Sequence, residues 1–418
     1  MIDLKLLRSD PDQLRESLQR RGSTIDLDEV IALDALHRAL LSDVEALRAA
    51  QNVASKAVAE AEGDAKGQAI ATAKSSSAGL KQSEKELSHA ASRLDEILAK
   101  LPNLVHPDVP KGDSDEHNVV LRQWGETPSR GSDHLAIGEA LDVIDVERAA
   151  KVSGSRFGFL KGKAAILELG LVRFAMDKAM SQGFTPVIPP ILVKREAMFG
   201  TGFFPTDEQQ VYRIEEDDLY LAGTSEVPIA GLHADEILDP DQLPIRYAGF
   251  SSCFRREAGT YGKDTRGIIR LHQFDKIEMF SLVEPDTSEE EHAFILNQEE
   301  EIFQALEIPY RVVDCCSGEL GAPYSRKFDI EAWLPASERW LEVTSCSNAL
   351  DYQARRMRIR IKGKDGNRLV HTLNGTAVAI QRAIVSIFEN HQSDDGSVNI
   401  PASLRPYTGF DTIEAPGS

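Results

Sequence analysis

The sequence is poor in positive charge and in long apolar runs. Its 418 residues include 47 Lys and Arg against 67 Asp and Glu, for a net charge of −20. The chain as a whole therefore does not attract nucleic acid, and such a partner would need local basic patches and shape. No stretch is long and apolar enough to span a membrane, and the first ten residues lack the apolar region of a signal peptide. We therefore expect a cytoplasmic protein without a membrane partner.

Cysteine is also scarce. The four cysteines include no C-x-x-C pair and no Cys/His pair at metal-binding spacing. Cys315 and Cys316 are adjacent, which is awkward for a single tetrahedral site. The pattern indicates reduced, buried thiols of a cytosolic protein, and no zinc is expected. The length allows two or three domains with a sizeable core.

A long alanine-rich stretch near the N-terminus predicts a helical arm. Residues 27–101 contain no Pro, Phe, Trp or Tyr, and apolar residues recur at heptad spacing on both sides of a break at Gly63, Asp64 and Gly67. This pattern predicts an antiparallel hairpin that forms a two-stranded coiled coil about 50 Å long. Alanines dominate the seam near the turn, so little apolar area is buried there and we expect a mobile tip.

The residues of the arm alone leave its role open. Most helical apolar stripes face a core, so a packed bundle or an oligomerisation arm would also fit. Nine basic and twelve acidic residues between positions 27 and 101 give a net charge of −3. The proline-rich segment after Leu101 is typical of a linker. We place a domain boundary near Pro102, between a domain at 1–102 and a second domain at 103–418.

The stretch from Phe254 to Phe280 reads FRREAGTYGKDTRGIIRLHQFDKIEMF. It predicts two antiparallel strands joined by a glycine-containing polar loop, which we expect to be exposed and mobile. Arg255 and Glu257 would share a face of the first strand. In the second strand, charged residues, Phe274 and Phe280 would line one face and apolar residues the other. The first face suits a ligand with a ring, a charged middle and an amine. By itself, a surface hairpin with a charge ladder is the commoner explanation of such a pattern.

Other segments predict helices around this hairpin. Residues 1–25 read as a short strand or turn, followed by a helix that starts at Pro11. Residues 164–182 predict an amphipathic helix, followed by a short strand that ends at Pro190. The residues of this helix expected to face the core are Leu167, Leu171, Phe174 and Met180. Residues 285–308 predict an acidic helix with a solvated face.

Two further strands and a helix are predicted near the C-terminus. Residues 328–335 and 339–348 read as strands, with Glu342 and Thr344 on one face. Residues 371–392 predict a strand, a glycine turn at Gly375, and a helix. The residues expected to point inward there are Val378, Ile384, Val385 and Phe388.

Several of these segments resemble one enzyme family. The pieces FRREAG, GKDTRG and RLHQFDKIE resemble motif 2 of class II aminoacyl-tRNA synthetases, and specifically the version found in seryl-tRNA synthetases. The segment 164–190 resembles motif 1, which forms the homodimer interface in this class, and 371–392 resembles motif 3. The hairpin at 27–101 resembles the N-terminal arm of the family, which lies along tRNA. With DGSVNIPASLRPY near the C-terminus, the match runs almost the whole length.

The resemblance implies an α+β fold: a class II catalytic domain on a mainly antiparallel sheet, with an N-terminal antiparallel coiled-coil arm that binds tRNA. It implies a cytoplasmic, homodimeric, ATP-dependent serine–tRNA ligase. Such an enzyme converts L-serine and ATP to seryl-adenylate and transfers serine to the 3′ end of tRNA(Ser) and, where it exists, tRNA(Sec). The serine carboxylate itself attacks the α-phosphorus, so the protein supplies position and charge.

The resemblance also assigns roles to residues. Catalysis falls to Arg255, Glu257 and Arg382. ATP would be bound by Arg255, Arg256, Glu257, Leu271, Phe274, Glu342, Val343, Thr344, Ser345 and Arg382. Serine would be bound by Thr224, Ser225, Glu226, Arg255, Glu278, Asn348 and Thr376. Glu342 and Ser345 would hold Mg²⁺ with ATP. Taken alone, Thr224, Ser225 and Glu226 look like a helix N-cap. The commoner form of motif 3 has glycine where this chain has Ala377 and Gln381.

Two alternatives stay open from the sequence. A paralogue of the family could make the aminoacyl-adenylate and pass it to another acceptor, such as a carrier protein, although the intact arm argues against this. A non-catalytic scaffold could retain the fold, and loss of Arg255, Glu278, Glu342 or Arg382 would favour it. All four residues are present.

Overall fold

The computed structural model describes residues 2–129, 131–259, 266–364 and 366–414. They fall into two compact units: Met1–Gln19 with Ser23–Leu101, and Arg20–Gly22 with Pro102–Ser418. None of the helices within the described ranges has the length and apolar character needed to cross a membrane. All four cysteines are buried and free, as the sequence predicted.

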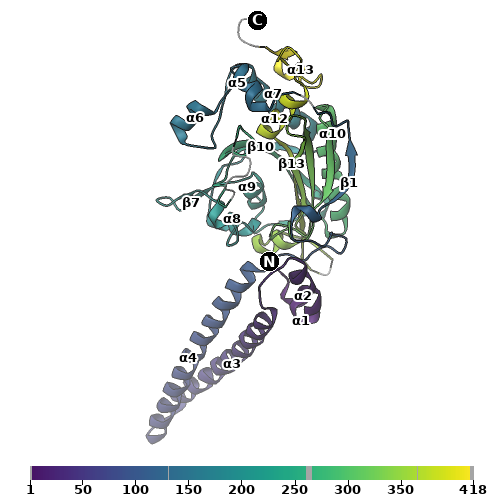
Figure 1. The fold of residues 1–418 in the computed structure, drawn as a ribbon. Helices are drawn as coiled ribbons and strands as arrows, with labels where there is room; N and C mark the ends of the chain where they lie inside the picture. The colour runs from purple at the N-terminus through teal and green to yellow at the C-terminus, as the bar shows by residue number, and fades with distance from the viewer. Residues whose placement is uncertain (1, 130, 260–265, 365, 415–418) are drawn as a thin grey trace. The chain divides into compact units, whose positions relative to one another are not determined.

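The first unit is helical (Figure 1). Its helices are α1 (Leu4–Ser9), α2 (Pro11–Arg20), α3 (Leu27–Glu60) and α4 (Asp64–Lys100). The start of α2 at Pro11 is confirmed. The strand or turn expected before it is wrong, because a helix forms there and the Asp3 side chain accepts a hydrogen bond from the Lys5 N–H at 2.7 Å.

The predicted hairpin is formed by α3 and α4, which run side by side in opposite directions (Figure 1). Ion pairs of 2.8 Å join Arg48 to Glu84 and Arg93 to Glu29, and this pairing of early with late positions fixes the antiparallel order. The helices are broken at residues 61–63, and Gly67 lies inside α4, so the break is shorter than predicted. Val44 and Leu80 are the buried apolar residues nearest the turn among those described, which agrees with the thin seam.

The second unit is built on a mainly antiparallel sheet, which confirms the predicted fold class. Among the described residues, eight strands pair in the order β1-β11-β12-β13-β16-β10-β9-β4, and the β4–β9 pair is parallel. Their bounds are β1 Val119–Trp124, β4 Thr185–Val187, β9 Ile245–Phe254, β10 Gln273–Val283, β11 Tyr310–Asp314, β12 Arg326–Leu334, β13 Arg339–Asn348 and β16 His371–Ala379.

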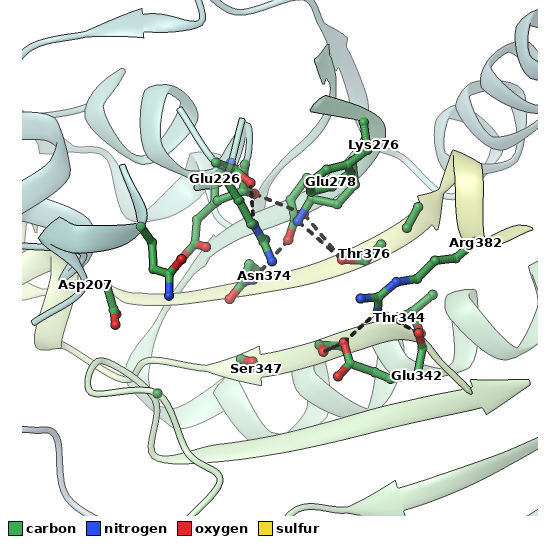
Figure 2. Close-up of a pocket in the computed structure, with 18 of the residues that line it drawn as sticks. Asp207, Glu226, Lys276, Glu278, Glu342, Thr344, Ser347, Asn374, Thr376 and Arg382 are labelled. Atoms are coloured by element: carbon green, nitrogen blue, oxygen red, sulfur yellow. Dashed lines mark hydrogen bonds and ion pairs between the residues drawn. The ribbon is translucent and has the colours of Figure 1, made fainter. Parts of the chain in front are cut away.

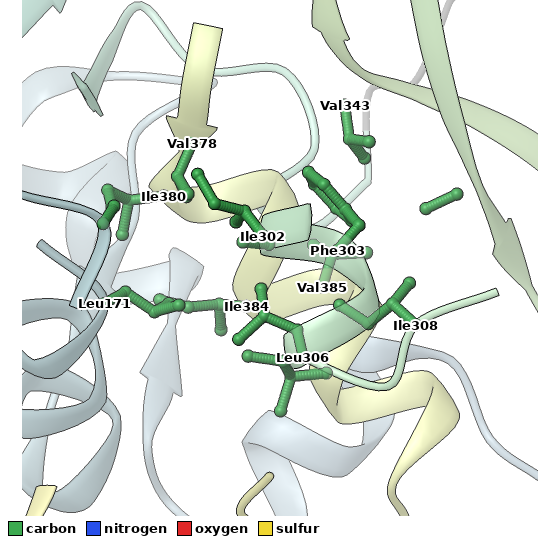
Figure 3. Close-up of a cluster of buried hydrophobic side chains, with 14 of the residues drawn as sticks. Leu171, Ile302, Phe303, Leu306, Ile308, Val343, Val378, Ile380, Ile384 and Val385 are labelled. Carbon is green, nitrogen blue, oxygen red and sulfur yellow. The ribbon is translucent and has the colours of Figure 1, made fainter. Parts of the chain in front are cut away.

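Helices α7 (Gly162–Ser181), α10 (Ser288–Ala305) and α12 (Ile380–Asn390) pack against this sheet. Leu171 of α7, Phe303 of α10 and Val385 of α12 belong to one buried cluster (Figure 3). Every residue predicted to face the core from α7 and α12 does so, with one exception. Met180 is 49% exposed because it lies in the last turn of α7.

Smaller elements complete the chain. They are η1 Asp115–His117, α5 His134–Ala140, β2 Ile144–Asp145, α6 Val146–Ser153, β3 Phe159–Leu160, β5 Leu192–Val193, α8 Arg195–Thr201, η2 Glu208–Gln210, β6 Arg213–Ile214, β7 Leu219–Leu221, α9 Glu226–Gly231, β8 Ile237–Leu238, η3 Pro240–Gln242, η4 Pro285–Thr287, α11 Tyr352–Met357, β14 Arg360–Ile361, β15 Arg368–Leu369, β17 Val398–Asn399, α13 Arg405–Thr408 and β18 Thr412–Ile413.

The acidic helix α10 has the predicted solvated face at Glu289 and Glu290, but its acidic residues are not all exposed. Glu291, Glu299 and Glu300 are buried, and each accepts a hydrogen bond. Arg246 donates to Glu291 at 2.7 and 2.6 Å, Arg122 pairs with Glu300, and the Thr344 hydroxyl donates to Glu299 at 2.7 Å. Periodicity alone cannot reveal these partners, because they come from strands distant in sequence.

The hairpin β9–β10 is antiparallel as predicted, but its strands are shorter. Arg255 and Glu257 lie beyond the end of β9, and Glu257 has φ +51°, so the two do not share a strand face. The loop was expected to be mobile, and residues 260–265 of it lie outside the described residues. Phe280, expected on the polar face, is buried in a second apolar cluster, so that face is polar only as far as Glu278.

Gly375 lies inside strand β16 and does not form the predicted turn. A Cβ atom there would lie 2.3 Å from Ile295 Cγ2 and 2.6 Å from Glu299 Oε1. Glycine at this position therefore allows strand β16 and helix α10 to approach closely.

Candidate active site

A cavity of about 430 Å³ opens over strands β10, β13 and β16. Its walls come from the ends of the β9–β10 hairpin, the start of α9, the loop before β12 and the start of α12 (Figure 2). These segments are far apart in sequence, and the antiparallel order of the sheet brings them together.

Glu278 lies fully buried at the floor of the cavity. Its carboxylate accepts hydrogen bonds from Thr224 Oγ1 at 3.2 Å, Asn374 Nδ2 at 3.0 Å and Thr376 Oγ1 at 3.5 Å, and it forms an ion pair with Lys276 (Figure 2). A buried carboxylate needs such compensation. Because Lys276 already balances its charge, Glu278 is suited to accept a hydrogen bond from a neutral hydroxyl.

Glu226 is a second buried carboxyl, at the first position of α9. It accepts hydrogen bonds from Tyr324 Oη at 3.0 Å and from Gln353 Nε2 at 2.7 Å. Burial and the neighbouring Glu278 raise the pKa of Glu226 to about 7, and the bonds from Gln353 and Tyr324 oppose this rise. A bound cation would draw Glu226 into its charged form.

Arg255 and Phe274 form an adjoining part of the wall. The guanidinium carbon of Arg255 lies 5.3 Å from the centre of the Phe274 ring, and Arg255 Nε donates to the Gly223 carbonyl at 3.2 Å. Glu257 accepts a 2.8 Å hydrogen bond from Arg270. An aromatic face, a guanidinium and a carboxylate in one cavity can stack a base, bind a phosphate and accept a hydrogen bond from an amino group.

Arg382 and Glu342 face each other at another side of the cavity (Figure 2). Arg382 donates to the Glu342 carbonyl at 2.6 Å and to Oε1 at 3.2 Å. Burial acts to raise the pKa of Glu342, but Arg382, Lys327 and Arg255 outweigh it, and the pKa lies below its usual value. Glu342 is therefore charged at neutral pH and available to a cation.

A β-bulge explains how Glu342 and Ser345 come together. Opposite β12, the register shifts so that Glu342 pairs with Glu331 while Thr344 pairs with Ile330. Thr344 consequently turns its hydroxyl toward Glu299 on α10, and the expectation that Glu342 and Thr344 share a face is wrong. Ser345 Oγ instead lies 3.5 Å from Glu342 Oε1.

Most residues assigned from the sequence line this one cavity. They are Thr224, Glu226, Arg255, Glu257, Leu271, Phe274, Glu278, Glu342, Val343, Thr344, Ser345, Thr376 and Arg382. Three other assigned residues do not line the cavity, and their side chains contact other groups. Ser225 donates to the Gly249 carbonyl, the Arg256 guanidinium lies 6.0 Å from the Tyr212 ring, and Asn348 approaches Glu289 at 3.4 Å. Asn348 is on the opposite face of β13 from Ser347, which does line the cavity, because side chains alternate along a strand.

Further lining residues were not singled out from the sequence. They include Asn374, Lys276, Tyr324, Lys327 and Gln381. Lys276 is two residues before Glu278 on one strand, so its proximity could have been found. Gln381, noted only as a departure from glycine, accepts the Asp275 N–H at 2.9 Å and so joins the start of α12 to the residue after Phe274.

The cavity offers oxygen ligands for a hard cation. The carboxylate of Glu342 and the hydroxyl of Ser345 are suitable donors for a divalent cation that shares its remaining ligands with phosphate. Within the described ranges, no group of three or more His, Cys, Asp or Glu is arranged to hold a metal ion without such help.

Two family models match the chain. Residues 210–391 match the class II core domain of tRNA synthetases (G, H, P, S and T), and residues 1–105 match the seryl-tRNA synthetase N-terminal domain. The serine–tRNA ligase of Thermobifida fusca is 50% identical over 420 residues, covering 99% of each chain. That of Nocardia farcinica is 49% identical over 421 residues, covering 100% of each.

Solved structures of seryl-tRNA synthetases are also similar to this chain. The seryl-tRNA synthetase from Pyrococcus horikoshii complexed with ATP is 41% identical with a TM-score of 0.94, covering 99% of this chain and 100% of that one. The cytoplasmic serine–tRNA ligase from Naegleria fowleri in complex with AMP is 33% identical with a TM-score of 0.89, covering 100% of this chain and 99% of that one.

Proposed function

The chain belongs to the seryl-tRNA synthetase family, and from this premise we propose that the cavity over Glu278 is where its two substrates react. As an ATP-dependent serine–tRNA ligase, it joins the carboxylate of L-serine to the adenylate group of ATP with release of pyrophosphate, and then transfers serine to the 3′ end of tRNA(Ser) with release of AMP. The observation that carries the proposal is that Arg255, Phe274 and Glu278 line one cavity. It contains groups for a phosphate, a base and a small polar amino acid.

Serine occupies the part of the cavity near the buried carboxyls. Glu226, with Thr224 and Glu278, binds the ammonium, and Glu278 with Thr376 forms hydrogen bonds with the hydroxyl. Because Lys276 balances Glu278, the hydroxyl is recognised by hydrogen bonds. Alanine would leave those groups unpaired, which explains its rejection.

ATP occupies the remaining part of the cavity. Phe274 stacks on adenine, Glu257 accepts a hydrogen bond from its amino group, and Arg255 binds the α-phosphate and the serine carboxylate. Arg382 neutralises the γ-phosphate, and its planar fork suits this anion. Glu342 and Ser345 would hold a divalent cation, which we propose to be Mg²⁺, and it would supply positive charge to balance the leaving pyrophosphate. The carboxylate of serine attacks the α-phosphorus, so these residues act by position and charge.

The two domains predicted from the sequence have different roles in this proposal. Residues 1–102 bind tRNA through the arm at 27–101, and residues 103–418 form the catalytic domain. An arm that reads RNA shape suits tRNAs with different anticodons, so tRNA(Sec), where it exists, is a further acceptor. The enzyme is a homodimer, and we place it in the cytoplasm.

The test is serine charging. Radiolabelled serine should become attached to bacterial tRNA in the presence of ATP, and EDTA should abolish the reaction. Periodate oxidation of the tRNA 3′ end should remove acceptance. ATP-dependent transfer of serine to a protein, but not to tRNA, would favour the paralogue with another acceptor.

A further inference from the structure

A three-residue segment of the N-terminal region belongs to the catalytic unit. Residues Arg20–Gly22 group with Pro102–Ser418, although the residues on both sides of them belong to the other unit. Within the catalytic unit, Arg20 donates to the His106 carbonyl at 3.3 Å, and Arg21 donates to the Asn103 carbonyl at 3.0 Å. Burial lowers the pKa of Arg21 to about 10, so it remains a cation at neutral pH.

Arg21 donates hydrogen bonds to backbone carbonyl oxygens of the loop between β11 and β12. Its guanidinium donates to Leu320 O at 3.2 Å, to Gly321 O at 3.3 Å and to Tyr324 O. The two intervening carbonyls accept hydrogen bonds from Asn103. Its backbone N–H donates to Ala322 O at 2.7 Å, and its side-chain amide donates to Pro323 O at 2.9 Å. All five successive carbonyls from 320 to 324 are thus held by these two residues.

This loop is part of the cavity wall. Gly321, Pro323 and Tyr324 line the cavity, and the hydroxyl of Tyr324 lies 3.0 Å from both carboxylate oxygens of Glu226. The loop has no regular secondary structure of its own. Its shape therefore depends on the groups that hold its carbonyls.

The hydrogen bond from Tyr324 affects the protonation state of Glu226. A hydroxyl that donates to a carboxylate stabilises the charged form, and this bond opposes the effect of burial on Glu226. If Tyr324 moved away, Glu226 would remain protonated to a higher pH and would hold an ammonium less well.

We infer that Arg21 is a positioning residue for serine recognition, which acts through the loop at 320–324 to hold Tyr324 against Glu226. The inference rests on the proposed assignment of the serine ammonium to Glu226. It gives a segment within the region that the N-terminal family model matches, residues 1–105, a role in the amino-acid pocket that is separate from tRNA binding.

The experiment measures serine-dependent ATP–pyrophosphate exchange for wild type, Arg21→Gln, Tyr324→Phe and the double variant. Each single variant should raise the KM for serine about tenfold, the size expected for a hydrogen bond to a charged group. The KM for ATP should change less than twofold. The double variant should be no worse than the more impaired single variant, because both changes remove the same bond. Effects that multiply, or an unchanged KM for serine in Arg21→Gln, would overturn the inference.

Arg20→Gln is the matched control. Arg20 also donates to carbonyls of the catalytic unit, at His106 and Val109, but not to the loop at 320–324. Both arginine variants should lower the melting temperature, whereas only Arg21→Gln should raise the KM for serine. Equal rises in both would show a merely structural role. If Arg21→Gln does not fold, Arg21→Lys replaces it as the test, because lysine retains the charge but has fewer hydrogen-bond donors. Arg21→Lys should raise the KM for serine, and a wild-type KM in this variant would contradict the inference.

A pH profile of the KM for serine distinguishes failure of the positioning role of Arg21 from failure of the proposed function. In wild type, the KM for serine should fall as Glu226 ionises, and in Arg21→Gln that fall should occur at a higher pH. Glu226→Gln tests the assignment itself. If it leaves the KM for serine unchanged, the proposed role of Glu226 is wrong. If it raises the KM while Arg21→Gln does not, the positioning role alone is wrong.

Discussion

Lys276 and Glu278 form an ion pair at the floor of the cavity, with side chains that are 8% and 0% exposed. Removing either partner leaves an uncompensated buried charge, which is strongly unfavourable. If serine binds at Glu278 as proposed, the pair links the binding of serine to the integrity of strand β10.

Glu278→Ala should remove most serine-dependent exchange. The loss should amount to about 2–5 kcal/mol of binding free energy, as for other truncations of one partner in a buried charge pair. Glu290→Ala, an exposed change on α10, is the matched control and should keep wild-type exchange. Near-wild-type exchange by Glu278→Ala would refute the placement of serine.

The KM for serine should depend on pH through Glu226. Its pKa lies near 7 instead of the usual 4.5, so the carboxyl is mostly neutral at pH 6 and mostly charged at pH 8. Serine carries an ammonium, so its KM should fall by up to about tenfold over that range. In Glu226→Gln, the KM should be higher and flat with pH. A KM that rises with pH in wild type would contradict the assignment.

Glu168 should make the protein less stable as pH rises. Burial and a hydrogen bond with Asp275 raise its pKa from 4.5 to about 8. The unfolded chain therefore loses this proton first, and stability is lost as pH rises from about 4.5 to about 8. Glu168→Gln removes the titration, so its melting temperature should fall less than that of wild type between pH 5 and pH 8.5. Parallel curves in scanning calorimetry would show that Glu168 titrates normally.

The dimer should form through α7 and β4. Large apolar side chains are exposed on and just after these elements, including Leu169 at 64%, Met180 at 49% and Ile188 at 82%. Light scattering at micromolar concentration should give twice the 46.0 kDa chain mass. Ile188→Asp should shift the mass toward one chain, whereas Val53→Asp in the arm should not. A stable, active monomer of wild type would rule out the dimer.

The arm should serve only the second half-reaction. Replacing residues 27–101 with a short Gly/Ser linker retains Arg21, so serine-dependent exchange should persist while charging of tRNA(Ser) falls steeply. Because the net charge of the arm is −3, few phosphates are neutralised. The slope of log affinity against log salt should be only about −2 to −3, and Lys74→Gln or Lys81→Gln should each change it by about one. Unchanged charging by the armless protein would contradict the role of the arm.

The sequence predicted what depends on local pattern and on the motifs. Heptad spacing predicted the hairpin, and the motif containing Arg255, Phe274 and Glu278 placed three residues that do line one cavity. The strand-then-helix pattern of residues 371–392 also predicted correctly that Val378 and Val385 face the core.

The sequence did not predict what depends on distant contacts. The bulge in β13 shifts the register and turns Thr344 toward Glu299, and no local pattern marks it. Tyr324 and Asn374 reach Glu226 and Glu278 from other parts of the chain. The burial of Glu299 likewise depends on how α10 packs against the sheet.

The most direct test of the central claim is ATP–pyrophosphate exchange by the wild-type protein with each of the twenty amino acids in turn. A cavity with Glu278 and Thr376 at its floor predicts that serine alone supports rapid exchange, with alanine and glycine far slower because they lack the hydroxyl and threonine slower because it lacks room. Faster exchange with alanine, glycine or threonine than with serine, or exchange with none of the twenty, would contradict the account.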